Sequence, residues 1–187
     1  MAVVINGNGT VTGISVGGLP DGIVDTDMLA ASAVTAAKVN PGLGEVLQVV
    51  TDTRTSSLSL TTDDTYNTIS GLNVDITPAS TSSKILVLVA LTIHTSTSMK
   101  LAYRLRRDST SIGNSTVGGS SLVGITGSGH NGTRGVPINF HFLDSPSTTS
   151  STTYSVQEIH NTGTFVLNSA GSNYEGSSMI TAIEVAS

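Results

Sequence analysis

The longest apolar run in the chain, Ile85–Leu91, constrains the fold more than any other segment. It lies within Thr81–Thr97, and polar turn-forming residues bound it on both sides. Its β-branched side chains are stiff at χ1, which suits a pleated sheet better than a helix. Beyond the run, Thr92 and His94 alternate with apolar residues, so one face becomes polar. We therefore expect one long strand in the centre of a β-sandwich, approaching the rim or a partner subunit at its end.

From residue 45 onward, short β-rich stretches alternate with turn signals, and almost no helix signal is present. The expected strands are 46–52, 57–61, 67–72 with 74–78, 81–97, 100–107, 111–113, 122–125, 136–144, 153–159, 163–167 and 178–185. The stretches 127–135 and 145–151 are expected to be loops, because they are rich in small polar residues. This pattern predicts an all-β, antiparallel sandwich or jelly roll for residues 45–187. A propeller is disfavoured, because no repeat of about 40 residues is present.

The composition excludes several classes of function. Charged residues make up 11% of the chain and cysteine is absent, so neither disulfides nor thiolate metal sites can form. A surface of Ser, Thr, Asn and Gly is typical of extracellular or virion β-proteins. The net charge of −5 argues against binding to the phosphate backbone of nucleic acids. The N-terminus does not resemble a signal peptide, and no stretch is apolar for long enough to span a bilayer, so we expect no membrane insertion.

Residues 1–44 form a different kind of segment. Asn6–Gly9 is a hairpin turn signal between two short β-rich stretches. Two units offset by ten residues, Val24–Leu29 and Val34–Val39, each carry a residue that can cap a short helix. Such repeats cannot bury a core alone, so we expect an extended assembly segment with short helical repeats, with a disordered leader as the alternative. The candidate docking residues are Val3, Ile5, Ile14, Val24, Leu29, Val34 and Val39.

No arrangement of residues indicates catalysis, a cofactor or a metal. The four histidines, His94, His130, His141 and His160, lack metal-binding spacing, which favours hydrogen-bonded or solvent-facing side chains over a metal or anion on a trimer axis. Asp144 and Glu158 could meet across strands, but so could any two of the 13 acids. The glycine-rich stretches are not followed by a helix that could bind phosphate. We therefore expect a protein that is not an enzyme.

Two features could contact a ligand. Arg104 and Arg106 point to the same side and could bind a carboxylate or sulfate, although pairing with acids of the same or a neighbouring subunit is favoured. The loops 127–135 and 145–151 suit adaptable hydrogen bonding to sugars, ordinary solvated loops being the alternative. The candidate receptor-contact residues are Ser128, His130, Asn131, Thr133, Arg134, Ser147 and Thr148.

An oligomer is expected for two reasons. Few lysines are present to guard exposed strand edges against pairing. Aromatic residues are only 4% of the chain, and Tyr103, Phe140, Phe142 and Tyr154 are spread over three strands. A monomeric core would therefore depend on aliphatic side chains alone, and symmetric neighbours would bury what one subunit leaves open.

Three stretches resemble small fibre and appendage proteins of tailed bacteriophages, particularly those of marine and cyanobacterial hosts. They are Gly44–Val50, Thr77–Val87 and Gly176–Glu184, and the likeness covers most of the chain. The resemblance implies a leader that docks on the virion or joins a shaft. It also implies a trimeric C-terminal jelly roll similar to the C1q and tumour-necrosis-factor fold, with receptor recognition at the distal end. It carries over no catalytic residues.

The sequence therefore predicts a virion structural protein, a short tail fibre or appendage. Its partners would be two further copies of itself, other virion proteins bound through residues 1–44, and a host-surface glycan. A capsid decoration or head fibre protein and a free carbohydrate-binding module are the alternatives. A polysaccharide depolymerase is disfavoured, because no carboxylate constellation is indicated.

Overall fold

A computed structural model describes residues 4–5, 11–12, 45–95, 97–114, 122, 124–130, 134–168 and 176–186. The chain divides into two units, Met1–Pro41 and Gly42–Ser187. In the first unit, β1 (Val4–Ile5) pairs antiparallel with β2 (Val11–Thr12), as the hairpin signal predicted. The helical repeats and the predicted docking residues other than Ile5 lie outside the described residues. The domain boundary predicted after residue 44 stays a prediction.

The second unit is an all-β sandwich of two antiparallel sheets, which confirms the predicted fold class. The six-stranded sheet contains β3 (Val46–Arg54), β4 (Leu58–Leu60), β6 (Lys84–Thr95), β10 (Arg134–Asp144), β12 (Phe165–Leu167) and β13 (Ser178–Val185). The five-stranded sheet contains β5 (Asn67–Ile76), β7 (Met99–Arg107), β8 (Thr110–Ile112), β9 (Thr126–His130) and β11 (Thr152–His160). The described residues form no helix, and so none that could cross a membrane.

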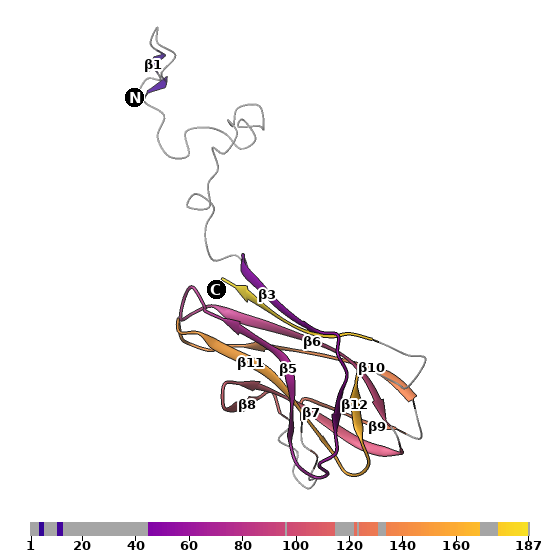
Figure 1. Cartoon of the computed structure of the whole chain (residues 1–187). Coiled ribbons are helices and arrows are strands. Elements are labelled where there is room, and N and C mark those ends of the chain that lie inside the picture. Colours follow the sequence, from indigo (N-terminus) through magenta and orange to yellow (C-terminus); the bar gives the residue numbers. More distant parts are fainter. Residues whose placement is uncertain are drawn as a thin grey trace. The chain divides into compact units, whose positions relative to one another are not determined.

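Strand β6 is the centre of the six-stranded sheet, as predicted. β10 pairs with one of its edges from Ile85 to Thr95, so β13 and β12 share the other edge. In the second sheet the order is β5-β11-β7, and β8 and β9 divide the remaining edge of β7. The long strands pass alternately from one sheet to the other, which is the connection pattern of a jelly roll (Figure 1).

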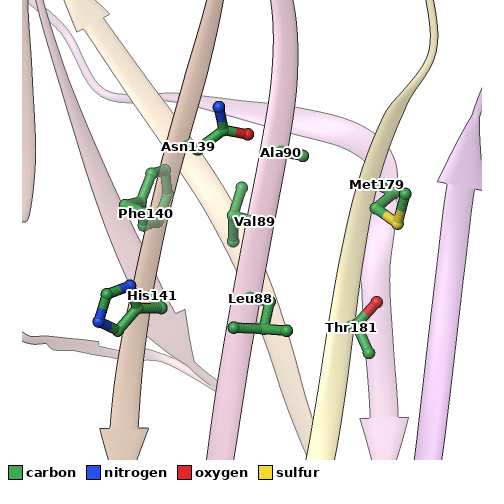
Figure 2. A pocket seen from close by; sticks show the side chains of 8 residues that line it. All are labelled: Leu88, Val89, Ala90, Asn139, Phe140, His141, Met179 and Thr181. Carbon is green, nitrogen blue, oxygen red and sulfur yellow. The ribbon is translucent and has the colours of Figure 1, made fainter.

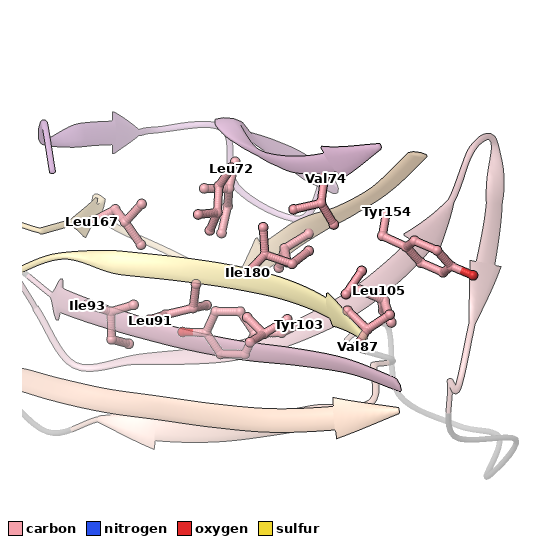
Figure 3. Packing of buried hydrophobic residues seen from close by; sticks show 14 of the residues in the cluster. Leu72, Val74, Val87, Leu91, Ile93, Tyr103, Leu105, Tyr154, Leu167 and Ile180 are labelled. Carbon is pink, nitrogen blue, oxygen red and sulfur yellow. The ribbon is translucent and has the colours of Figure 1, made fainter. Parts of the chain in front are cut away.

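The core lies between the two sheets. The inward side chains of β6 run from Ile85 to Ile93, and none of them is more than 3% exposed. In Figure 3, Leu91 and Ile93 lie with Tyr103 of the facing sheet. Alternation on β7 and β10 is also as predicted, with Tyr103 and its neighbours on β7 inward and Phe140 and Phe142 packed against the core. Each fully buried aliphatic side chain contributes about 1.5–3 kcal/mol.

An aromatic group joins the two sheets, so the expectation of a purely aliphatic core was wrong. The ring of Tyr103 on β7 lies 6.4 Å from Phe140 on β10 and 6.4 Å from Phe165 on β12, measured between centroids. Tyr103 and Phe165 are fully buried. These residues are far apart in the sequence, and they converge because the strands that carry them lie face to face.

The region after residue 121 also differs from the prediction. Instead of the strand expected at 122–125, Gly124 and Ile125 form a bend, and β9 follows within the expected loop. Gly124 permits the bend, because a Cβ at this position would lie 2.1 Å from the Tyr103 carbonyl oxygen. The Ile125 amide donates to that oxygen at 2.7 Å. β9 then pairs with β7 through its backbone, which requires no apolar side chains and explains why its composition resembles a loop.

Candidate functional site

The outer face of the six-stranded sheet is the strongest candidate for a functional surface. Here the register places Val49 opposite Ile183, Ile183 opposite Leu86, and Leu86 opposite Leu143. We call these four residues the apolar row, which crosses β3, β13, β6 and β10. Val49 is 57% exposed and Leu143 is 56% exposed, so the ends of the row are open to solvent. Leu86 and Ile183 between them are half-buried. A contiguous apolar row with open ends is a candidate interaction site.

A hollow of about 340 Å³ lies on the same outer face (Figure 2). Ala90 on β6 lies between Met179 on β13 and Asn139 on β10 in the sheet register. The next row places Leu88 between Thr181 and His141. Because Ala90 carries only a methyl group between longer side chains, the surface is recessed there. Carbon atoms dominate the lining, so the hollow suits an apolar side chain of another protein better than a reacting substrate.

Alternation on β13 explains how this surface arises. Ser178, Ile180, Ala182 and Glu184 point inward and are buried. The opposite face of the strand, Met179 to Val185, is therefore turned away from the core and carries no charged side chain. An outward face is usually polar in an antiparallel sheet with one solvated side. This strand instead presents apolar side chains on both faces.

The structure separates the predicted receptor-contact residues into two groups. The backbones of Ser128 and His130 belong to β9, and Arg134 begins β10. Ser147 and Thr148 follow the opposite end of β10, which has 11 residues and thus a length of roughly 35 Å. The two groups therefore cannot form one site within one subunit. Asn131 and Thr133 lie outside the described residues.

A buried acid–histidine group was missed in the sequence. His160 Nδ1 lies 2.9 Å from Glu158 Oε2, and Asn67 Nδ2 donates to Glu158 Oε1 at 2.9 Å. His160 Nε2 lies 3.2 Å from Asp63 Oδ1. Burial raises the pKa of Glu158, although the hydrogen bonds from His160 and Asn67 oppose this effect. The two-residue spacing on an alternating strand is the signal that places Glu158 and His160 on one face.

Asp144 and Glu158 do not meet. Asp144 on β10 accepts hydrogen bonds from Arg107 Nη1 at 3.0 Å and from Tyr154 Oη at 2.7 Å. Burial raises the pKa of Tyr154, and its hydrogen bond to Asp144 raises it further. Arg107 and Tyr154 belong to the five-stranded sheet, so this group ties the two sheets together. Its acid is engaged in structure rather than presented to a substrate.

The described part of the chain contains no group of three or more His, Asp or Glu side chains that could hold a metal ion. His94 and His141 lie on the outer face of the six-stranded sheet, as the alternation predicted, half-buried and exposed respectively. The side chain of His130 is outside the described residues, and His160 is fully buried.

Arg104 and Arg106 both lie on the outer face of the five-stranded sheet, in agreement with the prediction. Within the described residues neither forms an ion pair with an acid of its own subunit, and pairing with a neighbouring subunit stays a prediction. Both guanidinium groups instead contact Gln157 Oε1, and Arg106 Nη2 also donates to the Ser109 carbonyl oxygen.

No family model matches this sequence, and no curated protein matches it. Solved structures of infectious bursal disease virus are similar in part. The Gx strain structure is 13% identical over 75% of this chain and 41% of that chain, with a TM-score of 0.39. The T13 viral particle is 14% identical over 74% of this chain and 37% of that chain, with a TM-score of 0.42. The VP2 subviral particle is 14% identical over 75% of this chain and 37% of that chain, with a TM-score of 0.36.

This chain thus spans about two fifths of the length of the first of these viral chains. At these TM-scores the likeness assigns neither a family nor a function to the chain.

Proposed function

We propose that this chain is a virion structural protein, a short tail fibre or similar appendage. Residues 1–44 dock on other virion proteins, and the β-sandwich forms a homotrimer that attaches to the host surface. The apolar row is the observation that carries this proposal, because a chain that worked as a monomer would leave it in water. The resemblance of Gly44–Val50, Thr77–Val87 and Gly176–Glu184 to phage fibre and appendage proteins supports the virion assignment.

The occupant of the outer face is a neighbouring copy of the sandwich, in a contact that repeats around the axis of the trimer. Val49, Ile183, Leu86 and Leu143 carry no charge and cross four strands, so a neighbouring subunit can pack on this row without leaving one of its side chains as a buried, unpaired ion. Burial stabilises the assembly by about 25 cal/mol for each Å² of apolar surface removed from water. The face itself supports self-association, and the resemblance to phage appendages supports three copies about one axis.

The two ends of the sandwich can serve the two proposed roles, docking at one end and receptor contact at the other. The Ala186 amide donates to the Glu45 carbonyl at 2.9 Å, so the chain enters β3 beside the end of β13. Lys84 Nζ donates to Ser145 Oγ at 2.8 Å, and Val185 pairs with Lys84. Ser147 and Thr148 therefore lie toward the end at which the chain enters. The group at Ser128, His130 and Arg134 lies toward the opposite end, and it is the better candidate for receptor contact.

The solution mass of the full chain and of residues 45–187 tests the assembly. We expect three copies for both, because the outer face belongs to the sandwich. A compact monomer from both chains would contradict the homotrimer. Gold-labelled antibody against residues 45–187 on intact particles tests location: tail labelling supports the fibre, whereas capsid labelling would replace it with a decoration or head fibre protein. Absence from particles would overturn the virion role and favour a free carbohydrate-binding module.

A further inference from the structure

We propose that the outer face of the five-stranded sheet carries a binding site for an anionic polysaccharide, centred on Arg104 and Arg106. The inference rests on the proposed attachment role for its biological purpose, and it names the class of ligand. The geometry that supports it belongs to a different sheet from the apolar row.

Alternation on β7 places the two cations side by side. Leu101, Tyr103 and Leu105 are buried in the core, so Arg104 and Arg106 point outward from the same strand. β7 is an inner strand, flanked by β11 on one edge and by β8 and β9 on the other. The arginines therefore lie over the middle of a sheet, where neighbouring strands supply further polar side chains.

The two guanidinium groups are held in place before any ligand arrives. Arg104 Nε donates to Gln157 Oε1 at 2.7 Å, and Arg106 Nη1 approaches the same oxygen at 3.4 Å. Arg106 Nη2 also donates to the Ser109 carbonyl oxygen, which leaves Nη1 as the part of this fork nearest the shared site. Gln157 is itself fixed, because its Nε2 donates to Thr68 Oγ1 at 2.9 Å. Arg104 also stacks on the ring of Tyr66, with 3.5 Å between the guanidinium carbon and the ring centroid. Fixed side chains lose less conformational entropy when they bind a ligand.

The positive charge of this pair is not balanced by an acid. Both arginines share a neutral amide oxygen, and no described acid forms an ion pair with either of them. Burial lowers the pKa of Arg104; Tyr66 opposes this effect, and the neighbouring charge of Arg106 adds to it. Asp75 lies near in the register, but it accepts a hydrogen bond from Thr153. In a chain of net charge −5, an unbalanced pair of arginines is a site that an anion would stabilise.

The chemistry of the site selects the ligand class. Guanidinium forks match the paired oxygens of a carboxylate or a sulfate. In the sheet register, Ser155 and Ser111 lie opposite Arg106, and their hydroxyl groups suit the hydroxyl groups of a sugar. Two arginines are too few to neutralise a nucleic-acid backbone, whose affinity depends on many phosphate contacts. A polysaccharide that carries carboxylate or sulfate groups satisfies all of these features.

The test is binding of the full chain to immobilised alginate, dextran sulfate and neutral dextran at low salt. Alginate presents carboxylates and dextran sulfate presents sulfates, so these two arms identify the anion. We expect binding to at least one of them, none to neutral dextran, and a loss of about tenfold or more for Arg104→Gln and Arg106→Gln. Arg106→Lys keeps the charge without the fork, so we expect an intermediate loss.

Lys84→Gln is the matched control, because it removes one positive charge from the other sheet. Equal losses for Lys84→Gln and Arg106→Gln would overturn the site, and so would unchanged binding by both arginine variants. A wild-type chain that binds neither charged polymer, or that binds single-stranded DNA equally well, would also overturn it. If the protein is a trimer on virus particles but binds no charged polymer, the arginine site is wrong and the proposed virion function still stands.

Discussion

Leu143 on β10 lies directly opposite Leu86 on β6, and both side chains point away from the core. Leu143 is 56% exposed, although leucine is among the residues most often buried in folded proteins. The neighbouring member of the apolar row, Ile183, lies on the other side of Leu86. In the proposed oligomer, these side chains would be buried between subunits.

Leu143→Lys is expected to dissociate the proposed oligomer without unfolding the subunit. Burying an unpaired ammonium in an apolar interface costs several kcal/mol, which lowers the association constant by about a hundredfold or more. In the isolated subunit the lysine remains in water, so unfolding of the sandwich changes little. Solution mass across a concentration series measures the effect, and Thr149→Lys, at an exposed loop position, is the control. Equal masses for both variants would exclude this face from the interface.

Leu91→Ala and Leu88→Ala should differ strongly in stability, although the residues lie on the same strand. Leu91 is 2% exposed in the core, so its truncation should cost about 2–5 kcal/mol through lost burial and the remaining cavity. Leu88 is 39% exposed on the outer face, so its truncation should cost far less. Denaturant unfolding in the Leu143→Lys background isolates the subunit from assembly. Similar losses of unfolding free energy for the two variants would contradict the placement of Leu91 in the core and Leu88 on the outer face.

Gly124→Ala should destabilise the sandwich, whereas Gly135→Ala should be tolerated. A Cβ at Gly124 would lie 2.1 Å from a backbone oxygen, and relief would require the backbone of β7 or of the bend to move. We expect a cost of about 1–3 kcal/mol, as for other overpacked sites. At Gly135 the nearest atom to an added Cβ is 4.0 Å away, so that substitution should be near neutral. Thermal unfolding of the two variants beside wild type measures both costs. Equal stability of Gly124→Ala and Gly135→Ala would contradict the close approach at Gly124.

Local pattern was sufficient to predict most of the fold. The β-branched run from Ile85 to Leu91 predicted β6, and the alternation around Tyr103 predicted which side of β7 is buried. Pattern could not decide between the faces of β13, because Met179 and Ile183 on one face are as apolar as Ile180 and Ala182 on the other. Only the position of the facing sheet makes that choice.

The candidate sites were predicted less well than the strands. Arg104 and Arg106 were placed on the correct face, but their shared contact with Gln157 depends on the pairing of β7 with β11, which no local pattern specifies. β9 was missed because it pairs with β7 through backbone groups, which every residue carries. Its sequence, which includes Gly127, therefore has no apolar pattern that would indicate a strand. Contacts that depend on which strands become neighbours were therefore beyond prediction from local pattern.

Glu184 on β13 should make the stability of the sandwich depend on pH. Its side chain is buried, and it accepts hydrogen bonds from Gln48 Nε2 and from the Ala79 amide, the latter at 2.7 Å. Burial alone would raise the pKa of Glu184, but the hydrogen bonds from Gln48 and the backbone amides outweigh burial and hold the pKa below its ordinary value. The folded state therefore binds this proton more weakly than the unfolded state does. The resulting stabilisation is complete above the unfolded pKa and is lost as the pH falls through the lower, folded value.

Glu184→Gln should consequently be less stable than wild type at pH 7, by about 1–3 kcal/mol, because charged hydrogen bonds become neutral ones. The difference should narrow as the pH falls below the ordinary glutamate pKa of about 4.3 and disappear below the folded value. Urea unfolding at a series of pH values from neutral to strongly acidic measures this difference. Glu45→Gln removes an exposed carboxylate near the same end of the sandwich, and it should show no comparable gap. A gap for Glu184→Gln that stays constant at every pH would mean that the side chain contributes through its shape rather than its charge.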